Sequence, residues 1–230
     1  MKNKRIFVSG GAGVIGREIV NKLVKKGAIV MVGDLVEIPN GFPKNIIYRR
    51  GDLNYISQQE LDSFNPEIFF HLAATFERSD ETYEHWEENF LHNIKLSNHL
   101  MTLMRNVPSF KRVVYASSYL IYDKELYNFN EPKEKPVKLK ETDHINHRKL
   151  TGLSKLAHEM ELEFLSHFKS DKFTSICARI YRGYGKNSRD VISRWIRDLL
   201  ANKKISVYSP EGWFDYMYAG ESAEGLIQLS

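Results

Sequence analysis

The sequence predicts an α/β fold built on a doubly wound parallel sheet. Short apolar runs rich in β-branched residues alternate along the chain with longer amphipathic segments, a pattern typical of strands alternating with helices. A glycine-rich stretch joins the first apolar run to the first amphipathic segment, and an aspartate ends the second run. Because the predicted strands are short apolar runs, we expect helices to cover both faces of the sheet.

The lengths and periods of these segments predict the individual elements. The first strand, "RIFVSG", is a buried strand by its length and β-branching, and Ile15, Ile19, Leu23 and Val24 give the first helix its period. The predicted strands are residues 5–10, 28–34, 45–52, 67–74, 110–118 and 172–179. The predicted helices are residues 14–26, 82–106, 149–168 and 189–202.

Residues 123–148 interrupt this alternation. The stretch carries two prolines, many charges and little periodicity, so we expect a long surface excursion between the fifth strand and the next helix. Its lysines are more typical of a solvated face than of a binding patch. We see no internal repeat and no linker that divides the chain.

The composition is that of a soluble globular protein with one sizeable core. The chain has 230 residues, 42% of them hydrophobic, and its net charge of +4 is too small to indicate nucleic-acid binding. The single cysteine, Cys177, excludes an intrachain disulfide and favours a reducing compartment. The first apolar run is too short for a signal peptide, and no segment approaches a membrane span. We therefore expect a cytoplasmic protein that binds neither nucleic acid nor a membrane.

The stretch "VSGGAGVIG" (8–16) has the spacing of a dinucleotide-binding loop. Gly10, Gly13 and Gly16 recur every three residues, and Gly11, Gly13 and Gly16 satisfy the pattern G-x-G-x-x-G. Such glycines permit a tight turn, let a pyrophosphate approach the backbone, and let the helix pack closely on the strand. The helix N-terminus then offers free N–H groups to the phosphate. In this strand–turn–helix context, the motif predicts a Rossmann-like dinucleotide site.

Asp34 ends the second predicted strand and favours NAD over NADP. A carboxylate at this place can accept hydrogen bonds from both ribose hydroxyls of an adenosine, and it would repel a 2′-phosphate. No arginine follows in "DLVEIPN". The alternative is that Asp34 caps a turn or a helix. Asp52, in "RRGDL", can likewise be an adenine contact or a turn residue.

A series of stretches follows in order along the chain: "VSGGAGVIG", "RRGDL", "FFHLAA", "NIKLSNHL", "VVYASSYLIYD", "TGLSKLAHE", "ARIYRGYGK" and "WFDYMYAGESAEGL". Together they resemble the extended short-chain dehydrogenase/reductase family, in particular its nucleotide-sugar epimerases and dehydratases. The resemblance implies NAD at the switch point of the sheet and a nucleotide-diphosphate sugar between the sheet and a small C-terminal lobe. It implies a dinucleotide-binding domain, 1–178, and a substrate-binding lobe, 179–230, interleaved with it. We expect this lobe to be incomplete, because the chain stops at Ser230.

The resemblance also implies roles for individual residues. Ser118 would hydrogen-bond the sugar hydroxyl that loses hydride, and Lys155 would hold the nicotinamide ribose and lend the site positive charge. Without the resemblance, Lys155 would be interpreted as a surface lysine, and Ser117 and Ser118 as the end of a buried strand. The residues assigned to the cofactor are Gly10, Gly13, Val14, Ile15, Gly16, Asp34, Asp52, Leu53, Ala73, Ala74, Asn93, Ser117, Lys155, Ile180 and Tyr181.

The resemblance assigns the catalytic positions to Ser118, Lys155 and Thr151. This chain departs from the family at Thr151, where the family has a tyrosine. A phenol has an ordinary pKa of about 10, which a nearby ammonium lowers, whereas a threonine hydroxyl ionises at far higher pH. Thr151 can therefore donate or relay a hydrogen bond, but it cannot be the base. No tyrosine of this chain has a lysine four residues later.

A further departure also concerns the proton chemistry. The dehydratase branch of the family tends to have acidic residues directly after the serine, but "YLIYD" follows Ser118 here, which counts against dehydration. Family members that lack the tyrosine can use a carboxylate instead. Glu77, Asp80 and Glu81 are candidates because they follow "HLAAT" and are expected over the pocket.

Arg182 is the candidate substrate-binding residue besides Ser118. It stands where the family often has an asparagine, and it would hold a diphosphate by a two-pronged contact. The family's usual arginine for this purpose is replaced by Phe214. The alternative interpretation of Arg182 is a surface arginine on a loop.

Two functions remain open from the sequence. The first is an NAD-dependent epimerase/dehydratase that exchanges hydride between a sugar carbon and NAD, with a group other than Thr151 taking the proton. The second is a non-catalytic protein that binds NAD or a nucleotide sugar as a sensor or partner. The resemblance also implies a homodimer through helices 82–106 and 149–168. The candidate contact residues are Leu91, Ile94, Leu100, Leu156 and Met160, some of which must face the sheet instead.

Overall fold

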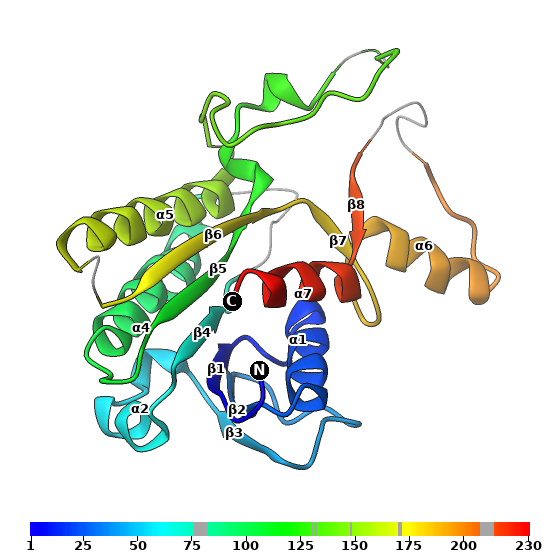
Figure 1. Ribbon diagram of the computed structural model, residues 1–230. Helices are drawn as coiled ribbons and strands as arrows, with labels where there is room; N and C mark the ends of the chain where they lie inside the picture. The colour runs from blue at the N-terminus through cyan, green and yellow to red at the C-terminus, as the bar shows by residue number, and fades with distance from the viewer. Residues whose placement is uncertain (76–81, 130, 132, 148, 170–171, 208–213) are drawn as a thin grey trace.

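The computed structural model describes residues 1–230 except 76–81, 130, 132, 148, 170–171 and 208–213 (Figure 1). One sheet has the strand order β3-β2-β1-β4-β5-β6, and every neighbouring pair in it is parallel. Helices cover both of its faces, so the predicted doubly wound α/β class is confirmed (Figure 1). The strands are β1 (Arg5–Ser9), β2 (Ile29–Asp34), β3 (Ile46–Arg50), β4 (Ile68–His71), β5 (Arg112–Ser118) and β6 (Thr174–Ile180).

The helices agree with the sequence where the amphipathic period is long. α1 (Val14–Lys25), α5 (Lys149–Lys169) and α6 (Val191–Leu200) lie where they were predicted. α2 (Gln58–Phe64) was not predicted, because seven residues are too few to establish a period. Its sequence signal is the capping box in which the side chains of Ser57 and Glu60 each bind the other's backbone N–H.

The predicted helix 82–106 consists of three consecutive segments. α3 (Glu84–Asn89) leads into a π-helical turn (Phe90–Lys95), which continues as α4 (Leu96–Met104). Such π-helical turns are uncommon and occur frequently at functional sites. The turn contains Asn93, whose side chain is buried. Leu100, one of the candidate dimer residues, is fully buried and faces the sheet.

The strands supply an apolar core to each face of the sheet. In β1, Phe7 points to one face while Ile6 and Val8 point to the other, as the two-residue period of a strand requires. α4 and α5 cover the face of Phe7, whereas α1 and α7 (Ala219–Gln228) cover the opposite face (Figure 1).

The C-terminal segments lie on the side of α1 and α7. β7 (Arg182–Tyr184) pairs in parallel with β8 (Tyr216–Tyr218), and α6 lies beside this pair (Figure 1). β6 runs through the predicted boundary at residue 178, and α7 packs Ala223, Leu226 and Ile227 into the core of the sheet. The C-terminal segments are therefore interleaved with the sheet, and the division into two domains stays a prediction.

The excursion at 123–148 projects beyond the carboxyl end of β5 (Figure 1). It begins with a 3₁₀ turn (Lys124–Leu126) and returns to the chain that follows β5. There Ile145 forms an antiparallel bridge with Tyr122, and Asn146 N–H donates to the Ile121 carbonyl at 3.1 Å. Within the described part of the chain, no helix is long and apolar enough to cross a membrane. The same residues contain no cluster of histidine, cysteine and carboxylate side chains that could hold a metal ion.

Candidate functional site

A cavity of about 380 Å³ opens at the carboxyl ends of β1, β2 and β4. The strand order reverses between β1 and β4, and this switch point is where doubly wound sheets bind their ligands. Seven of the residues assigned to the cofactor line the cavity: Gly10, Gly13, Asp34, Asp52, Leu53, Ala73 and Ala74. The sequence did not single out Thr75, Glu88 and His92, which also line it.

Gly10 and Gly16 of the glycine loop lie too close to their neighbours to carry a side chain. Gly10 has a φ of +70°, and a Cβ on it would lie 2.6 Å from the backbone nitrogen of Ala73. A Cβ on Gly16 would collide with the Gly10 carbonyl oxygen. Gly13 is the N-cap of α1 and supplies no side-chain cap, so the first N–H groups of the helix remain for an anion.

Asp34 holds the loop and faces the cavity. Its carboxylate accepts the Ala12 N–H at 2.9 Å and the Val36 N–H at 3.3 Å. The sequence left open whether this aspartate is a cap or a ribose contact, and in the structure it binds turn backbone while lining the cavity. Arg50 of β3 pairs in register with Asp34 of β2, a proximity that the sequence did not reveal. The guanidinium of Arg50 binds Glu37 at 2.8 Å.

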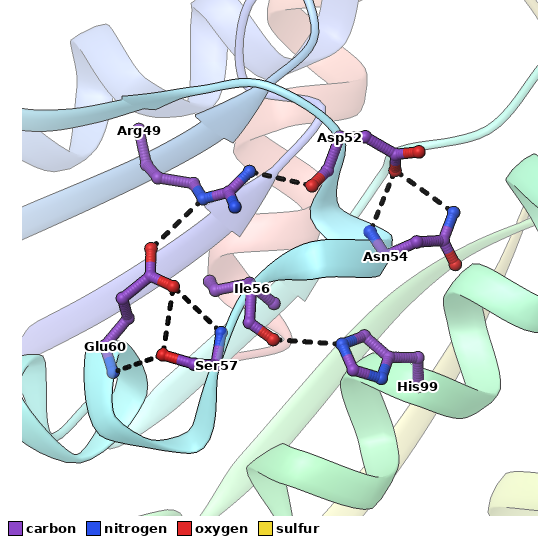
Figure 2. Close-up of polar contacts among 7 residues, drawn as sticks. All are labelled: Arg49, Asp52, Asn54, Ile56, Ser57, Glu60 and His99. Atoms are coloured by element: carbon purple, nitrogen blue, oxygen red, sulfur yellow. Dashed lines mark hydrogen bonds and ion pairs between the residues drawn. The ribbon is translucent and has the colours of Figure 1, made fainter.

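The far end of the cavity is fixed by a polar network around Asp52 (Figure 2). Asp52 caps a 3₁₀ turn (Leu53–Tyr55) by accepting the Asn54 N–H at 2.8 Å, and Arg49 donates to the Asp52 carbonyl at 2.8 Å. Arg49 also binds Glu60 of the α2 capping box at 3.2 Å. Asp52 is therefore both a turn residue and part of the cavity wall. Leu53 fits here because Gly33 has no side chain. A Cβ on Gly33 would lie 2.6 Å from the side chain of Leu53.

Asn93 joins the loop after β4 to α5. Its Oδ1 accepts the Thr75 N–H at 2.7 Å, while its Nδ2 donates to Thr75 Oγ1 at 2.9 Å and to Ser154 Oγ at 3.3 Å. These contacts connect the cavity wall at Thr75 to the helix that carries Lys155.

A buried histidine lies beneath the glycine loop. His71 contacts Ser9 Oγ through Nδ1 at 2.7 Å and Ser97 Oγ through Nε2 at 2.8 Å. Burial, with smaller contributions from His158 and Lys155, holds the pKa of His71 well below its ordinary value. The imidazole is therefore neutral near pH 7, and it ties the end of β1 to α4.

Ser117 and Ser118 end β5 as predicted. The hydroxyl of Ser117 is buried and has no hydrogen-bond partner among the residues that the structure describes. Ser118 Oγ accepts the Leu120 N–H at 3.2 Å and so caps a 3₁₀ turn, Tyr119–Ile121. Ile180 of β6, which was assigned to the cofactor, pairs in register with Ser118 of β5.

Lys155 is a buried lysine rather than a surface one. Its side chain is 7% exposed, its ammonium donates to the Ala116 carbonyl at 2.6 Å, and it lies 4.8 Å from the ring centre of Tyr115. Burial lowers the pKa of Lys155 to about 8, against a smaller opposing effect of the Glu159 carboxylate. The lysine therefore lies directly beside the strand that ends in Ser117 and Ser118.

Thr151 is buried in the first turn of α5, one helical turn before Lys155. The next residue, Gly152, lets this end of the helix approach the chain after β5. A Cβ on Gly152 would lie 2.6 Å from the Leu120 carbonyl oxygen. α5 thus begins in close contact with the 3₁₀ turn that follows Ser118.

The remaining assigned residues lie around β7 and the start of α1. Val14 and Ile15 open α1 and lie close to Gly185 and Gly183, respectively. Tyr181 stacks on Tyr119. Glu77, Asp80 and Glu81, the candidate carboxylates, lie outside the described residues.

Arg182 lies on β7 and is partly buried, so it is not a solvated loop arginine. Its Nε donates to the Tyr119 hydroxyl at 3.1 Å, and its guanidinium lies 4.2 Å from the ring centre of Phe214. Arg182 and Phe214, two of the residues in which this chain departs from the family, therefore contact each other. The role of Arg182 toward a diphosphate stays a prediction.

The glycine cradle, the Asp34 carboxylate and the cavity fit a dinucleotide. The family model described as the NAD dependent epimerase/dehydratase family matches residues 6–229. The chain belongs to this family. The resemblance noted from the sequence is thereby confirmed, and the NAD expected as cofactor is the cofactor that names the family. No curated protein matches the chain.

Solved structures of low sequence identity share the fold. MoeE5 in complex with UDP-glucose and NAD is 24% identical with a TM-score of 0.79, over 96% of this chain and 70% of that one. UDP-glucose 4-epimerase from Thermotoga maritima with UDP-glucose is 22% identical with a TM-score of 0.80, over 97% and 72%. The NAD-dependent NDP-hexosamine 5,6-dehydratase TunA is 20% identical with a TM-score of 0.79, over 99% and 72%. At these identities the likeness establishes the fold alone.

Proposed function

We propose that this chain is an NAD-dependent oxidoreductase of the nucleotide-sugar epimerase/dehydratase type. The observation that carries the proposal is the continuity of one site along the sheet. The cavity with its glycine cradle lies at β1, β2 and β4, and the adjacent β5 ends in Ser117 and Ser118 beside the buried Lys155. A dinucleotide bound at the switch point would extend from the first set of residues to the second.

The residues of the cavity would hold the cofactor. The backbone of the glycine loop and the N-terminus of α1 would bind the pyrophosphate, and Asp34 would accept the adenosine ribose hydroxyls. When bound, NAD would supply the hydride acceptor of the reaction. Lys155 would lend positive charge beside Ser117, whose buried hydroxyl is available for a hydrogen bond.

Nucleotide-diphosphate sugars are the proposed substrates. Structural neighbours were solved with UDP-glucose, UDP-glucuronic acid and related ligands, and they share this fold. Ser118 would hydrogen-bond the sugar hydroxyl at the carbon that exchanges hydride. Thr151 would donate or relay a hydrogen bond, and another group would take the proton, because a threonine hydroxyl is too weak an acid to be the base.

The alternative is a non-catalytic protein that binds NAD or a nucleotide sugar. The replacement of the family's tyrosine by Thr151 favours it, since general base catalysis contributes about 10²- to 10⁴-fold to such reactions. The buried Lys155 beside Ser117 favours the enzyme, because a protein that only binds the adenosine half of NAD has no need for this cation.

Calorimetry with NAD and a panel of nucleotide-diphosphate sugars tests the proposal. We expect NAD to bind the purified protein and at least one sugar nucleotide to bind the NAD-loaded protein. The absence of NAD binding would overturn the enzymatic function, and the absence of both NAD and sugar-nucleotide binding would overturn both functions. Binding of both ligands while the cofactor stays fully oxidised would favour the non-catalytic function.

The proposal includes a cytoplasmic homodimer in which helices of 82–106 and 149–168 meet those of a second copy. α5 exposes a stripe of large apolar side chains, Met160, Phe164 and Phe168, on its outer face. These residues are spaced by one helical turn, so they form one continuous strip. An exposed strip of this kind is typical of a contact surface.

A further inference from the structure

The structure contains a phenol–cation pair directly beside Ser118. Tyr119 follows Ser118 in the chain, and its hydroxyl accepts a hydrogen bond from Arg182 Nε at 3.1 Å. The tyrosine whose place Thr151 takes would have formed such a pair with Lys155. The sequence could not reveal a substitute pair, because its two members are separated by 63 positions and lie on different elements.

Packing fixes the position of the Tyr119 ring. The ring stacks on Tyr181 with centres 5.4 Å apart and planes 11° apart, and it meets Tyr127 edge-on at 5.1 Å. Tyr119 is only 6% exposed, so few water molecules can compete for its hydroxyl. In such surroundings the charge of a neighbouring guanidinium acts more strongly than it would in water.

A second phenol–guanidinium pair, at the residue directly after this 3₁₀ turn, provides a comparison. Arg179 donates to the Tyr122 hydroxyl at 2.9 Å, but it also binds the Glu159 carboxylate at 2.8 Å. That carboxylate neutralises the guanidinium. Arg182, in contrast, forms no ion pair with a carboxylate in the described ranges of the chain. Besides Tyr119, it contacts the Phe214 ring and the Tyr216 hydroxyl.

The charge balance around Arg182 favours an ionised phenol. Burial acts to lower the pKa of Arg182, yet attraction to the hydroxyls of Tyr119 and Tyr216 raises it above its ordinary value. The attraction is mutual, so the guanidinium favours the phenolate form of its partner. Burial, followed by the charges of Tyr122, Asp215, Asp143 and Glu141, raises the pKa of the neighbouring Tyr181 to about 12. Burial and these negative charges oppose ionisation of a phenol in this cluster, whereas the direct contact of Tyr119 with Arg182 promotes it.

Resting on the proposed function, we propose that Tyr119, activated by Arg182, is the acid–base group that replaces the missing tyrosine. The O–H bond of the sugar hydroxyl breaks, and its proton passes to the Tyr119 phenolate oxygen. NAD, when bound, would accept the hydrogen of the same carbon as hydride, so that the carbon–oxygen bond becomes a carbonyl. In the reverse direction, the Tyr119 phenol returns the proton to the carbonyl oxygen as hydride comes back.

The first experiment compares Tyr119→Phe with the matched control Tyr122→Phe. Each variant removes one buried hydroxyl that is bound to an arginine and keeps the ring. We expect Tyr119→Phe to lower the rate of nicotinamide reduction at least about 10²-fold without weakening sugar-nucleotide binding. The rate of the wild type should fall as the pH decreases, and this dependence should be lost in Tyr119→Phe. Tyr122→Phe should keep both the rate and the pH dependence.

The second experiment does not depend on turnover. Ultraviolet absorbance of tyrosinate is recorded as the protein is titrated with alkali. We expect one tyrosine to ionise at lower pH than the others, with its signal lost in Tyr119→Phe, kept in Tyr122→Phe, and moved to higher pH in Arg182→Gln. The proposal is overturned if the tyrosinate absorbance that is missing in Tyr119→Phe appears in the wild type only at the highest pH, together with the last tyrosines to ionise.

The two experiments separate this proposal from the proposed function. An active wild type with an equally active Tyr119→Phe variant overturns the role of Tyr119 and leaves the function standing. If the wild type transfers no hydride to any sugar nucleotide that it binds, the enzymatic function fails. The titration then decides whether Tyr119 is activated by Arg182.

Discussion

At the scale of single residues, Thr151 and Lys155 separate two tasks that a tyrosine–lysine pair would perform together. Lys155 keeps its buried place beside β5 and its positive charge at neutral pH, because its pKa of about 8 lies above 7. Thr151, one turn earlier, is too short and too weakly acidic to take a proton. In the proposed function, the cation for the cofactor is thus retained, while the base would come from another element.

Asp34 should determine the preference for NAD over NADP. Asp34→Asn keeps an acceptor for the Ala12 N–H but removes the negative charge that would repel a 2′-phosphate. We expect the variant to narrow the ratio of NAD to NADP affinity at least tenfold, a change of about 1.4 kcal/mol. Calorimetry with both cofactors measures this, with Asp62→Asn on α2 as the control. Equal or better NADP binding by the wild type would contradict the prediction.

Lys155 should make stability depend on pH. Its pKa is about 8 in the folded chain and 10.5 when unperturbed, so the folded state binds fewer protons between these values. The free energy of unfolding should therefore rise as the pH increases from 8 to 10.5, by on the order of 3 kcal/mol at most. Lys155→Met should remove this rise and be more stable than the wild type at pH 7.

Urea unfolding at a series of pH values checks the prediction for Lys155. The difference between wild type and Lys155→Met isolates the lysine from the tyrosines that titrate in the same range. Lys95→Met, which changes an exposed lysine of the π-helical turn, is the control. Parallel curves for Lys155→Met and the wild type would show that the lysine is not desolvated.

At the scale of elements, the close approach of α5 to the turn after β5 should depend on Gly152. Gly152→Ala places a Cβ against the Leu120 carbonyl and should destabilise the fold by about 1–3 kcal/mol. Gly225→Ala on α7 is the matched control, since a Cβ there meets no atom within 4 Å. This second variant should stabilise the protein by up to about 1 kcal/mol. Urea unfolding at pH 7 measures both, and a Gly152→Ala variant as stable as the wild type refutes the packing argument.

The elements that the sequence predicted are those with a long period or a complete local motif. The glycine loop was predictable because its three functions, turn, phosphate approach and helix packing, require glycine within nine consecutive residues, 8–16. α2 was not predicted because it is too short to show a period. The π-helical turn was not predicted because a single altered turn barely changes the spacing of the apolar residues. Contacts such as Arg50 beside Asp34 depend on strand register, which a single sequence does not display.

At the scale of the whole molecule, the exposed strip on α5 should support a homodimer. Met160, Phe164 and Phe168 are 61%, 62% and 72% exposed, and the rings of Phe164 and Phe168 lie 4.7 Å apart. Phe164→Glu would place a charge at the centre of the strip and should yield monomers in light scattering after size exclusion. Leu200→Glu, at an exposed position of α6, should leave the mass unchanged. A monomeric wild type would contradict the assembly.

The most direct test of the account is single-turnover hydride transfer. NAD-loaded wild type, Thr151→Val and Thr151→Tyr are each mixed with nucleotide-diphosphate sugars shown to bind, and the absorbance of reduced nicotinamide is followed. The account predicts reduction by the wild type, a rate for Thr151→Val within about tenfold of it because no base is lost, and a rate for Thr151→Tyr that equals or exceeds it. Loss of a robust native activity in Thr151→Val would make Thr151 itself the catalytic group. Oxidised cofactor in all three proteins, despite bound sugar nucleotide, would contradict the proposed function.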